Sequence, residues 1–385
     1  MYYLKLILRN ALRHRLRTAL TTLGIVIAVL AFGLLRTVVD AWYAGAEAAA
    51  ATRLVTRNAI SLVFPLPLTY GDRIRRVDGV RTVSFANWFG GVYISERNFF
   101  PQFAVDARSY FKLYPEYVVA PEQMKEFLHD RKAAIVGRKL ADTYGWKLGD
   151  AIPLRGTIYP GTWTFILRGI YEGRDPGTDA AQFFLRWDYL NDTVTVTQPR
   201  RANLVGIFLV DIDDADRAAQ VSADIDRTFR NSLAETLTET ERAFQLGFVS
   251  MSEAIVMAIR IVSFMVILII MAVMANTMAM SARERLAEYA TLKALGFGPA
   301  FVRTLVFGES LAIALVGGAL GCLLTFPAAA AFAAQMGTLF PVFRVSSETV
   351  VMQLAAALGL GVVAALVPAI RASRVRIAEG LRAIG

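Results

Sequence analysis

Residues 261–280 read IVSFMVILIIMAVMANTMAM, a run that contains no charged side chain. A helix of about 20 apolar residues is long enough to cross the hydrocarbon core of a bilayer. Three more stretches have similar composition: 20–39, interrupted only by Arg36; 310–335, which contains Pro327; and 349–370, which contains Pro368. The sequence therefore predicts four transmembrane helices.

The overall composition agrees with a membrane protein. Only 19% of the 385 residues are charged, whereas soluble domains carry about 25%. The net charge of +9 lies outside the central region, because 25 basic and 25 acidic residues balance between positions 43 and 250. A nucleic-acid-binding protein would place its excess charge on a folded domain. We therefore expect membrane lipid, and no nucleic acid, to contact the basic residues.

The basic residues beside the predicted spans indicate the orientation. They are Lys5, Arg9, Arg13, Arg15 and Arg17 before the first span; Arg283, Arg285, Lys293 and Arg303 between the second and third; and Arg371, Arg374, Arg376 and Arg382 after the fourth. The positive-inside rule places these three segments in the cytoplasm. Both termini are then cytoplasmic, and residues 43–250 and 337–348 lie outside.

These assignments predict nine segments. They are a cytoplasmic amphipathic helix (1–19), a first span (20–42), an extracytoplasmic α/β domain and stalk (43–250), a second span (251–280), a cytoplasmic helix and loop (281–303), a third span (304–336), a short external loop (337–348), a fourth span (349–370) and a cytoplasmic tail (371–385). In the leader, leucines recur every fourth position with a basic residue after each, which is typical of a helix lying in the membrane interface.

The central region reads as a mixture of strands and helices. Alternating or β-branched runs predict strands at 60–64, 80–85, 91–95, 103–107 and 204–211, and a hairpin from 152–154 and 162–171. Helical periodicity marks 214–231, and residues 232–257 are expected to continue as a helical stalk into the second span. The many aromatic residues between Trp88 and Tyr117 favour a packed core, with an exposed site for an acyl chain or apolar partner as the alternative.

The most informative motif lies between the second and third spans. Residues 276–296 read NTMAMSARERLAEYATLKALG, in which charged positions precede the apolar Tyr289, Leu292 and Leu295. Gly296 is expected to end a helix. A short helix that is charged first and apolar afterwards suits docking in a groove of another protein.

This motif resembles the hallmark of the MacB-type, FtsX-like ABC transporter permeases, the type VII ABC transporter transmembrane subunits. The matching positions are Asn276, Ser281, Glu284, Arg285, Glu288, Lys293, Ala294, Leu295, Gly296 and, in the third span, Glu309. Tyr289-Ala290 replaces the Ile-Gly that is usual in the family. Residues 134–150, which end in Gly149-Asp150, and the C-terminal residues 368–382 are also similar to family segments.

The resemblance implies a fold and a set of partners. The fold is an α-helical membrane protein with four transmembrane helices and a large mixed α/β extracytoplasmic (MacB-like periplasmic core) domain between helices 1 and 2. The partners are two copies of a cytoplasmic ABC ATPase, a second permease in a homodimer or paralogous heterodimer, and a periplasmic adaptor. The implied location is the bacterial inner membrane. The ATPase would dock on a coupling helix comprising Arg283, Glu284, Arg285, Glu288, Tyr289, Leu292, Lys293, Leu295 and Gly296.

Two functions are compatible with this resemblance. The first is export or extraction of an amphiphile, peptide or lipoprotein by mechanotransmission, in which ATP-driven motion is passed to the external domain. The alternative is an FtsX-like signalling unit that regulates a cell-wall hydrolase or a sensor. An adaptor gene beside this one would favour the first function, and a hydrolase or sensor gene the second.

The chain itself is expected to be non-catalytic. It contains no G-x-x-x-x-G-K-[ST] sequence, so ATP and Mg are expected on the partner ATPase and no cofactor on this chain. No metal site is expected, because its two histidines, His14 and His129, lie on opposite sides of the membrane in this topology. Asn276 and Glu309 are predicted to be membrane-embedded structural residues, Glu309 pairing with a leader arginine. A proton-handling role for Glu309 is the alternative.

Overall fold

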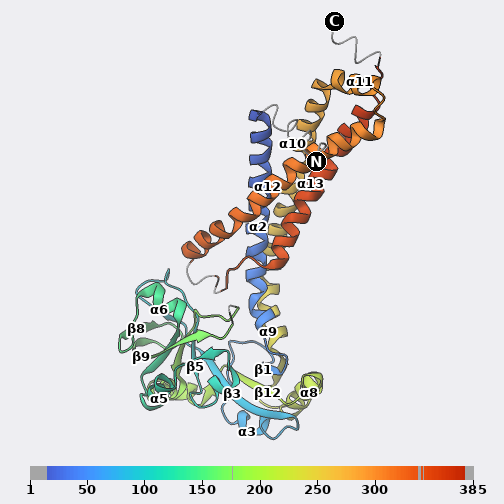
Figure 1. Ribbon diagram of the computed structural model, residues 1–385. Coiled ribbons are helices and arrows are strands. Elements are labelled where there is room, and N and C mark those ends of the chain that lie inside the picture. Colours follow the sequence, from blue (N-terminus) through green and yellow to red (C-terminus); the bar gives the residue numbers. More distant parts are fainter. Residues whose placement is uncertain (1–14, 176, 337–339, 341, 378–385) are drawn as a thin grey trace. The chain divides into compact units, whose positions relative to one another are not determined.

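The computed structural model describes residues 15–175, 177–336, 340 and 342–377 (Figure 1). They form two compact units. The helical unit contains the described residues up to Asp40, residues 253–335 and those from Phe343 onwards. The α/β unit contains Ala41–Ser252 and the described residues of 336–342.

Four long helices in the described residues are long and apolar enough to cross a membrane. They are α2 (Arg15–Ala48), α10 (Glu253–Glu284), α12 (Pro299–Met336) and α13 (Ser347–Ser373), and the short α11 (Leu286–Ala294) lies between α10 and α12. The α/β elements come between the first and second of these helices, so the predicted fold class is confirmed. The amphipathic leader helix falls outside the described residues as far as residue 14, and residues 15–19 belong to α2.

Small residues bring the helices of this unit close together. At Gly321 of α12, a Cβ atom would lie 2.8 Å from the Cβ of Val29 on α2, and at Gly318 it would lie 2.4 Å from that of Ala357 on α13. A larger side chain at either glycine would push α12 away from its neighbours. This close packing of small residues is typical of helices that associate in lipid.

Polar side chains also join α2, α12 and α13. The Gln353 amide nitrogen donates to the Val29 carbonyl and to the Thr325 hydroxyl, each at 2.8 Å, and Gln353 is fully buried. Nearer the N-terminal end of α13, Asp40 accepts hydrogen bonds from Ser346 and Thr349 at 3.0 and 2.9 Å. Interhelical hydrogen bonds of this kind hold transmembrane helices in register.

The α/β unit is built on one sheet of eleven strands. The strand order is β13-β1-β12-β3-β5-β10-β7-β9-β8-β4, with β6 paired to β9, and β2 and β11 form a separate pair. The strands are β1 (Arg53–Asn58), β2 (Leu66–Pro67), β3 (Val80–Trp88), β4 (Gly91–Val92), β5 (Gln102–Val105), β6 (Tyr117–Val118), β7 (Ala133–Gly137), β8 (Ala151–Gly156), β9 (Gly161–Gly173), β10 (Phe183–Arg186), β11 (Leu204–Val205), β12 (Ile207–Ile212) and β13 (Thr236–Thr240). The helices are α3 (Tyr70–Ile74), α4 (Tyr110–Leu113), α5 (Pro121–His129), α6 (Arg138–Tyr144), α7 (Trp187–Thr197), η1 (Pro199–Arg201), η2 (Ala215–Arg217), α8 (Ala218–Thr228) and α9 (Glu241–Met251).

The sheet separates two hydrophobic cores. Successive residues of a strand point to opposite faces, so Phe183 and Leu185 of β10 join one core while Phe184 joins the other. Most of the aromatic residues between 88 and 117 lie in these cores, as predicted. Trp88 and Phe99 are the exposed members of the set.

Two local predictions were wrong. Residues 60–64 form a turn, and the strand lies before them, at β1, where Arg53 and Arg57 hide its apolar pattern. The stalk predicted as a continuous helix over 232–257 instead contains β13, which pairs with β1, and it breaks at Ser252 between α9 and α10. Pairing with β1 supplies hydrogen bonds that outweigh the helical propensity of this segment.

A glutamine side chain closes part of the sheet into a ring. Strand β4 lies in the connection between β3 and β5, yet it pairs with β8 at the far end of the strand order. The buried Gln102 of β5 bridges the remaining gap: its amide oxygen accepts from the Gly91 N–H at 2.6 Å, and its amide nitrogen donates to the Gly91 carbonyl at 2.8 Å. The path from β5 through β10, β7, β9, β8 and β4 therefore returns to β5.

We expect Gln102→Leu to lower the free energy of unfolding of the α/β unit by about 2 kcal/mol, because it leaves the N–H and carbonyl of Gly91 without partners. Thermal unfolding of the full-length protein in detergent measures this effect. Gln220→Leu, at an exposed position of α8, is the matched control. Equal stability of the Gln102 and Gln220 variants would contradict the closing role of Gln102.

Candidate functional site

The candidate functional site is the connecting segment, residues 284–298, which joins α10 to α12. Its centre is Arg285, at the break between α10 and α11. The guanidinium donates through Nη1 to Glu309 of α12 at 2.8 Å and through Nε to Glu288 of α11 at 2.9 Å. Arg285 and Glu309 are both buried. This ion pair holds the start of α11 against α12.

Two further contacts hold the connecting segment to α2 and α13. Glu284 forms a bidentate pair with Arg17 of α2, with both N–O distances at 2.7 Å. Lys293 donates to the carbonyls of Ser373 and Val375, at 2.6 and 2.9 Å, where α13 ends. A cation at a helix C-terminus satisfies unpaired carbonyls and the helix dipole. The connecting segment is thus attached to three of the long helices.

The apolar residues of the connecting segment divide into a buried and an exposed group. Tyr289 is buried in a small core with residues of α12 and α13, and Leu292 packs against it. Ala290 is also buried. Leu295 is 72% exposed and Phe297 is 43% exposed, just beyond the end of α11. Gly296, between them, has a φ of +93°, a conformation that lets the chain leave the helix and that glycine adopts freely.

The structure therefore gives the predicted docking residues different positions. Arg285, Tyr289 and Lys293 contact the chain's own helices, whereas Arg283, Leu295 and Gly296 are exposed. Phe297, stacked on Phe301 at 4.6 Å, was missed. A large apolar residue between two glycines at a helix end is the signal that could have marked it.

The two polar residues that were predicted to be membrane-embedded, Glu309 and Asn276, have different surroundings. Glu309 is buried in its pair with Arg285, and the leader arginines before residue 15 lie outside the described residues. Asn276 lies on an exposed face of α10, where no described residue hydrogen-bonds to its side chain.

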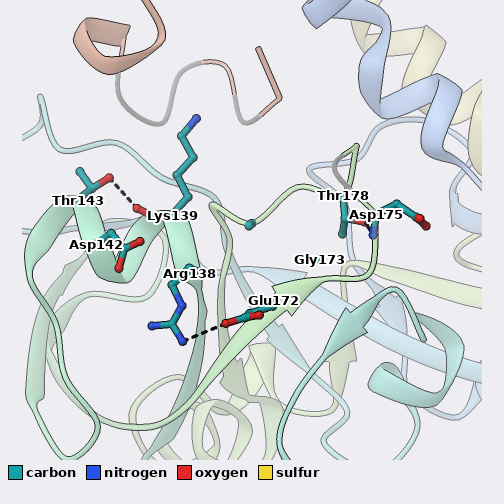
Figure 2. A pocket seen from close by; sticks show the side chains of 9 residues that line it. Arg138, Lys139, Asp142, Thr143, Glu172, Gly173, Asp175 and Thr178 are labelled. Atoms are coloured by element: carbon teal, nitrogen blue, oxygen red, sulfur yellow. Dashed lines mark hydrogen bonds and ion pairs between the residues drawn. The ribbon is translucent and has the colours of Figure 1, made fainter. Parts of the chain in front are cut away.

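A second feature is a polar cavity of about 800 Å³ on the α/β unit, where α6 faces the end of β9 (Figure 2). Arg138 pairs with Glu172 at 3.2 Å, and Thr143 donates to the Lys139 carbonyl at 2.7 Å. Burial lowers the pKa of Lys139 and raises that of the neighbouring Asp179. The lining residues include no nucleophile paired with a base, and no group of metal-ligating side chains occurs in the described part of the chain.

These features define an integral membrane protein with four candidate spans, a domain inserted between the first two, and a connecting segment, residues 284–298, that contacts three of the candidate spans. Residues 18–228 match the family model of the MacB-like periplasmic core domain, and residues 260–377 match that of the FtsX-like permease C-terminal region. The first match covers more than half of the chain. The protein therefore belongs to the MacB/FtsX-type ABC transporter permeases, whose ATPase resides on a partner chain.

Solved structures with similarity to this chain include the following two. One is the extracellular domain of the noncanonical ABC-type transporter YknZ from Gram-positive bacteria, with 12% identity and a TM-score of 0.36, over 49% of this chain and 98% of that chain. The other is the periplasmic region of MacB from Actinobacillus actinomycetemcomitans, with 7% identity and a TM-score of 0.39, over 52% of this chain and 94% of that chain. No curated protein matches the chain.

Proposed function

We propose that this permease works by mechanotransmission, passing motion from two copies of a cytoplasmic ABC ATPase to its α/β unit outside the inner membrane. The observation that carries the proposal is the connecting segment: its charged residues attach it to α2, α12 and α13, while Leu295 and Phe297 stay exposed. A force applied at Leu295 and Phe297 would therefore be transmitted to α2, α12 and α13 together. The proposed orientation has both termini in the cytoplasm, as the basic residues predict.

The class of cargo follows from the family resemblance. We propose export or extraction of an amphiphile, a peptide or a lipoprotein, with a periplasmic adaptor as a further partner. ATP and Mg would bind the ATPase, so this chain would need no cofactor of its own.

The docking surface can be tested by co-purifying the full-length permease with the ABC ATPase encoded beside it. We expect Leu295→Asp combined with Phe297→Asp to weaken ATPase retention at least tenfold, because two charges would enter an apolar contact. Val196→Asp, which adds a charge at an exposed apolar position of the α/β unit, is the control. Undiminished retention in the double variant would place the docking surface elsewhere.

The proposed second permease has a candidate contact on α10. Asn276 is exposed there beside Val273 and Met280, on the least buried of the four long helices. An amide in lipid without a partner is unfavourable, and asparagine side chains hydrogen-bond across transmembrane helices. We expect Asn276→Leu to weaken self-association about threefold, measured by energy transfer between labelled copies in liposomes.

The control for this prediction is Thr277→Val. The Thr277 hydroxyl donates to the Val273 carbonyl of its own helix at 2.9 Å, so its loss should leave association unchanged. Equal association of wild type and the Asn276 variant would remove Asn276 from the permease contact.

A further inference from the structure

The chain enters and leaves the α/β unit at adjacent positions. Helix α2 ends at Ala48 and β1 begins at Arg53, whereas β13 ends at Thr240 and α9 begins at Glu241. Because β1 and β13 are antiparallel neighbours, with Leu54 opposite Thr240, the two connections lie side by side.

A buried group of side chains joins the two connections. We call it the Arg53 cluster; it consists of Arg53, Tyr114, Glu116 and Glu241. Arg53 donates through Nε to Glu241 at 2.7 Å and through Nη2 to Glu116 at 2.6 Å. Glu241 also accepts from the Tyr114 hydroxyl at 2.9 Å and from the backbone N–H of Ala50 at 3.3 Å. The side chains of Arg53 and Glu241 are only 6% and 8% exposed.

The Arg53 cluster reaches a third part of the α/β unit. Arg53 also donates to the Leu113 carbonyl at the end of α4, at 3.0 Å, and its guanidinium lies 4.1 Å from the centre of the Tyr114 ring. The Tyr114 ring stacks on Tyr117 of β6, which pairs with Gly173 of β9. A continuous set of contacts therefore runs from the entry and exit of the chain to the long strand β9.

Net stability does not account well for such a cluster. Burying one cation with two carboxylates carries a large desolvation cost, and uncharged residues of similar size often stabilise a protein as well or better. Burial alone would lower the pKa of Arg53, but the hydrogen bond that Arg53 donates to Glu116 and the negative charge of Glu241 raise this pKa, so the guanidinium stays charged. The hydrogen bonds of Arg53 instead fix the start of β1, the start of α9 and the end of α4 in position relative to one another.

We infer that Arg53, Glu116 and Glu241 are positioning residues, which make the entry of β1 and the start of α9 move together and pass that movement to β6 and β9. This inference rests on the proposed mechanotransmission. In this proposal, the Arg53 cluster transfers movement of the two chain connections, from α2 to β1 and from β13 to α9, to the strands of the sheet.

The test is hydrogen exchange of the full-length permease in nanodiscs with its ATPase, with and without ATP. In the wild-type protein, ATP is expected to change the rate of hydrogen exchange in peptides from α9, β6 and β9. The variant is the uncharged triple Arg53→Met, Glu116→Gln, Glu241→Gln, which leaves no unpaired buried charge. Its α9 response should persist, whereas its response at β6 and β9 should fall at least fivefold.

The matched control is Arg57→Met. Arg57 lies on the same strand and pairs with Glu239 of β13 at 3.0 Å, but it makes no contact with Glu116 or Glu241. It should keep the full response. If the triple variant kept the wild-type response at β6 and β9, the Arg53 cluster would not transmit movement and would have only a structural role. A wild type with no ATP-dependent change anywhere in the α/β unit would overturn the proposed function, and with it this inference.

Discussion

Replacing Arg285 with methionine is expected to lower the free energy of unfolding of the helical unit by about 3–5 kcal/mol. The substitution removes one partner of a buried ion pair, and removing one partner of such a pair is strongly destabilising. Because the pair with Glu309 attaches the start of α11 to α12, its loss would let the start of α11 separate from α12. Thermal unfolding in nanodiscs measures the first effect, and protease cleavage within residues 286–298 measures the second.

Two variants make this prediction specific. Arg303→Met removes an exposed arginine from α12 and should change stability little. Arg285→Met combined with Glu309→Met should recover most of the stability, because no buried charge remains. If the single Arg285 variant were as stable as the Arg303 variant, the ion pair with Glu309 would not hold the segment. ATPase coupling should stay low in the stable double variant, because α11 has lost its attachment to α12.

The Arg53→Met single variant is expected to lose a similar 3–5 kcal/mol, this time from the α/β unit, because two carboxylates lose their shared cation. The Arg57→Met variant breaks a half-buried pair with Glu239 and should cost about 1 kcal/mol or less. Chemical unfolding of the full-length protein, followed by exchange in β1 and β13 peptides, separates the two. If both variants lost the same free energy of unfolding, the ion pairs of Arg53 would contribute no more than the ordinary cross-strand pair of Arg57 with Glu239.

The contacts of Arg285 and Arg53 could not be predicted from the sequence. The motif around Arg285 was recognised, and its charged residues were assigned to a partner's surface. The structure instead uses Arg285 and Lys293 inside the chain and leaves Leu295 and Phe297 exposed. Arg53 was not recognised at all, since an arginine at the start of a strand resembles an exposed residue until its two carboxylates are located.

Four apolar spans, an inserted α/β domain and the family motifs could all be predicted from the amino-acid sequence alone. Lipid acts on each stretch of chain according to its own composition, so a run such as 261–280 needs no partner to be recognised. Local alternation likewise marked strands β8 and β9, in which buried and more exposed residues alternate.

The pairing of the charged side chains could not be predicted from the sequence, because the partners are far apart along the chain. Arg17 is 267 residues from Glu284, Arg53 is 188 from Glu241, and Lys293 is 80 from Ser373. The closure by Gln102 likewise depends on the pairing of β4 with β8, which the local sequence around Gly91 and Gln102 does not show. The physical reason is that the free energy of a buried charge or amide is set by its partners and its burial, and both exist only once distant segments have packed together.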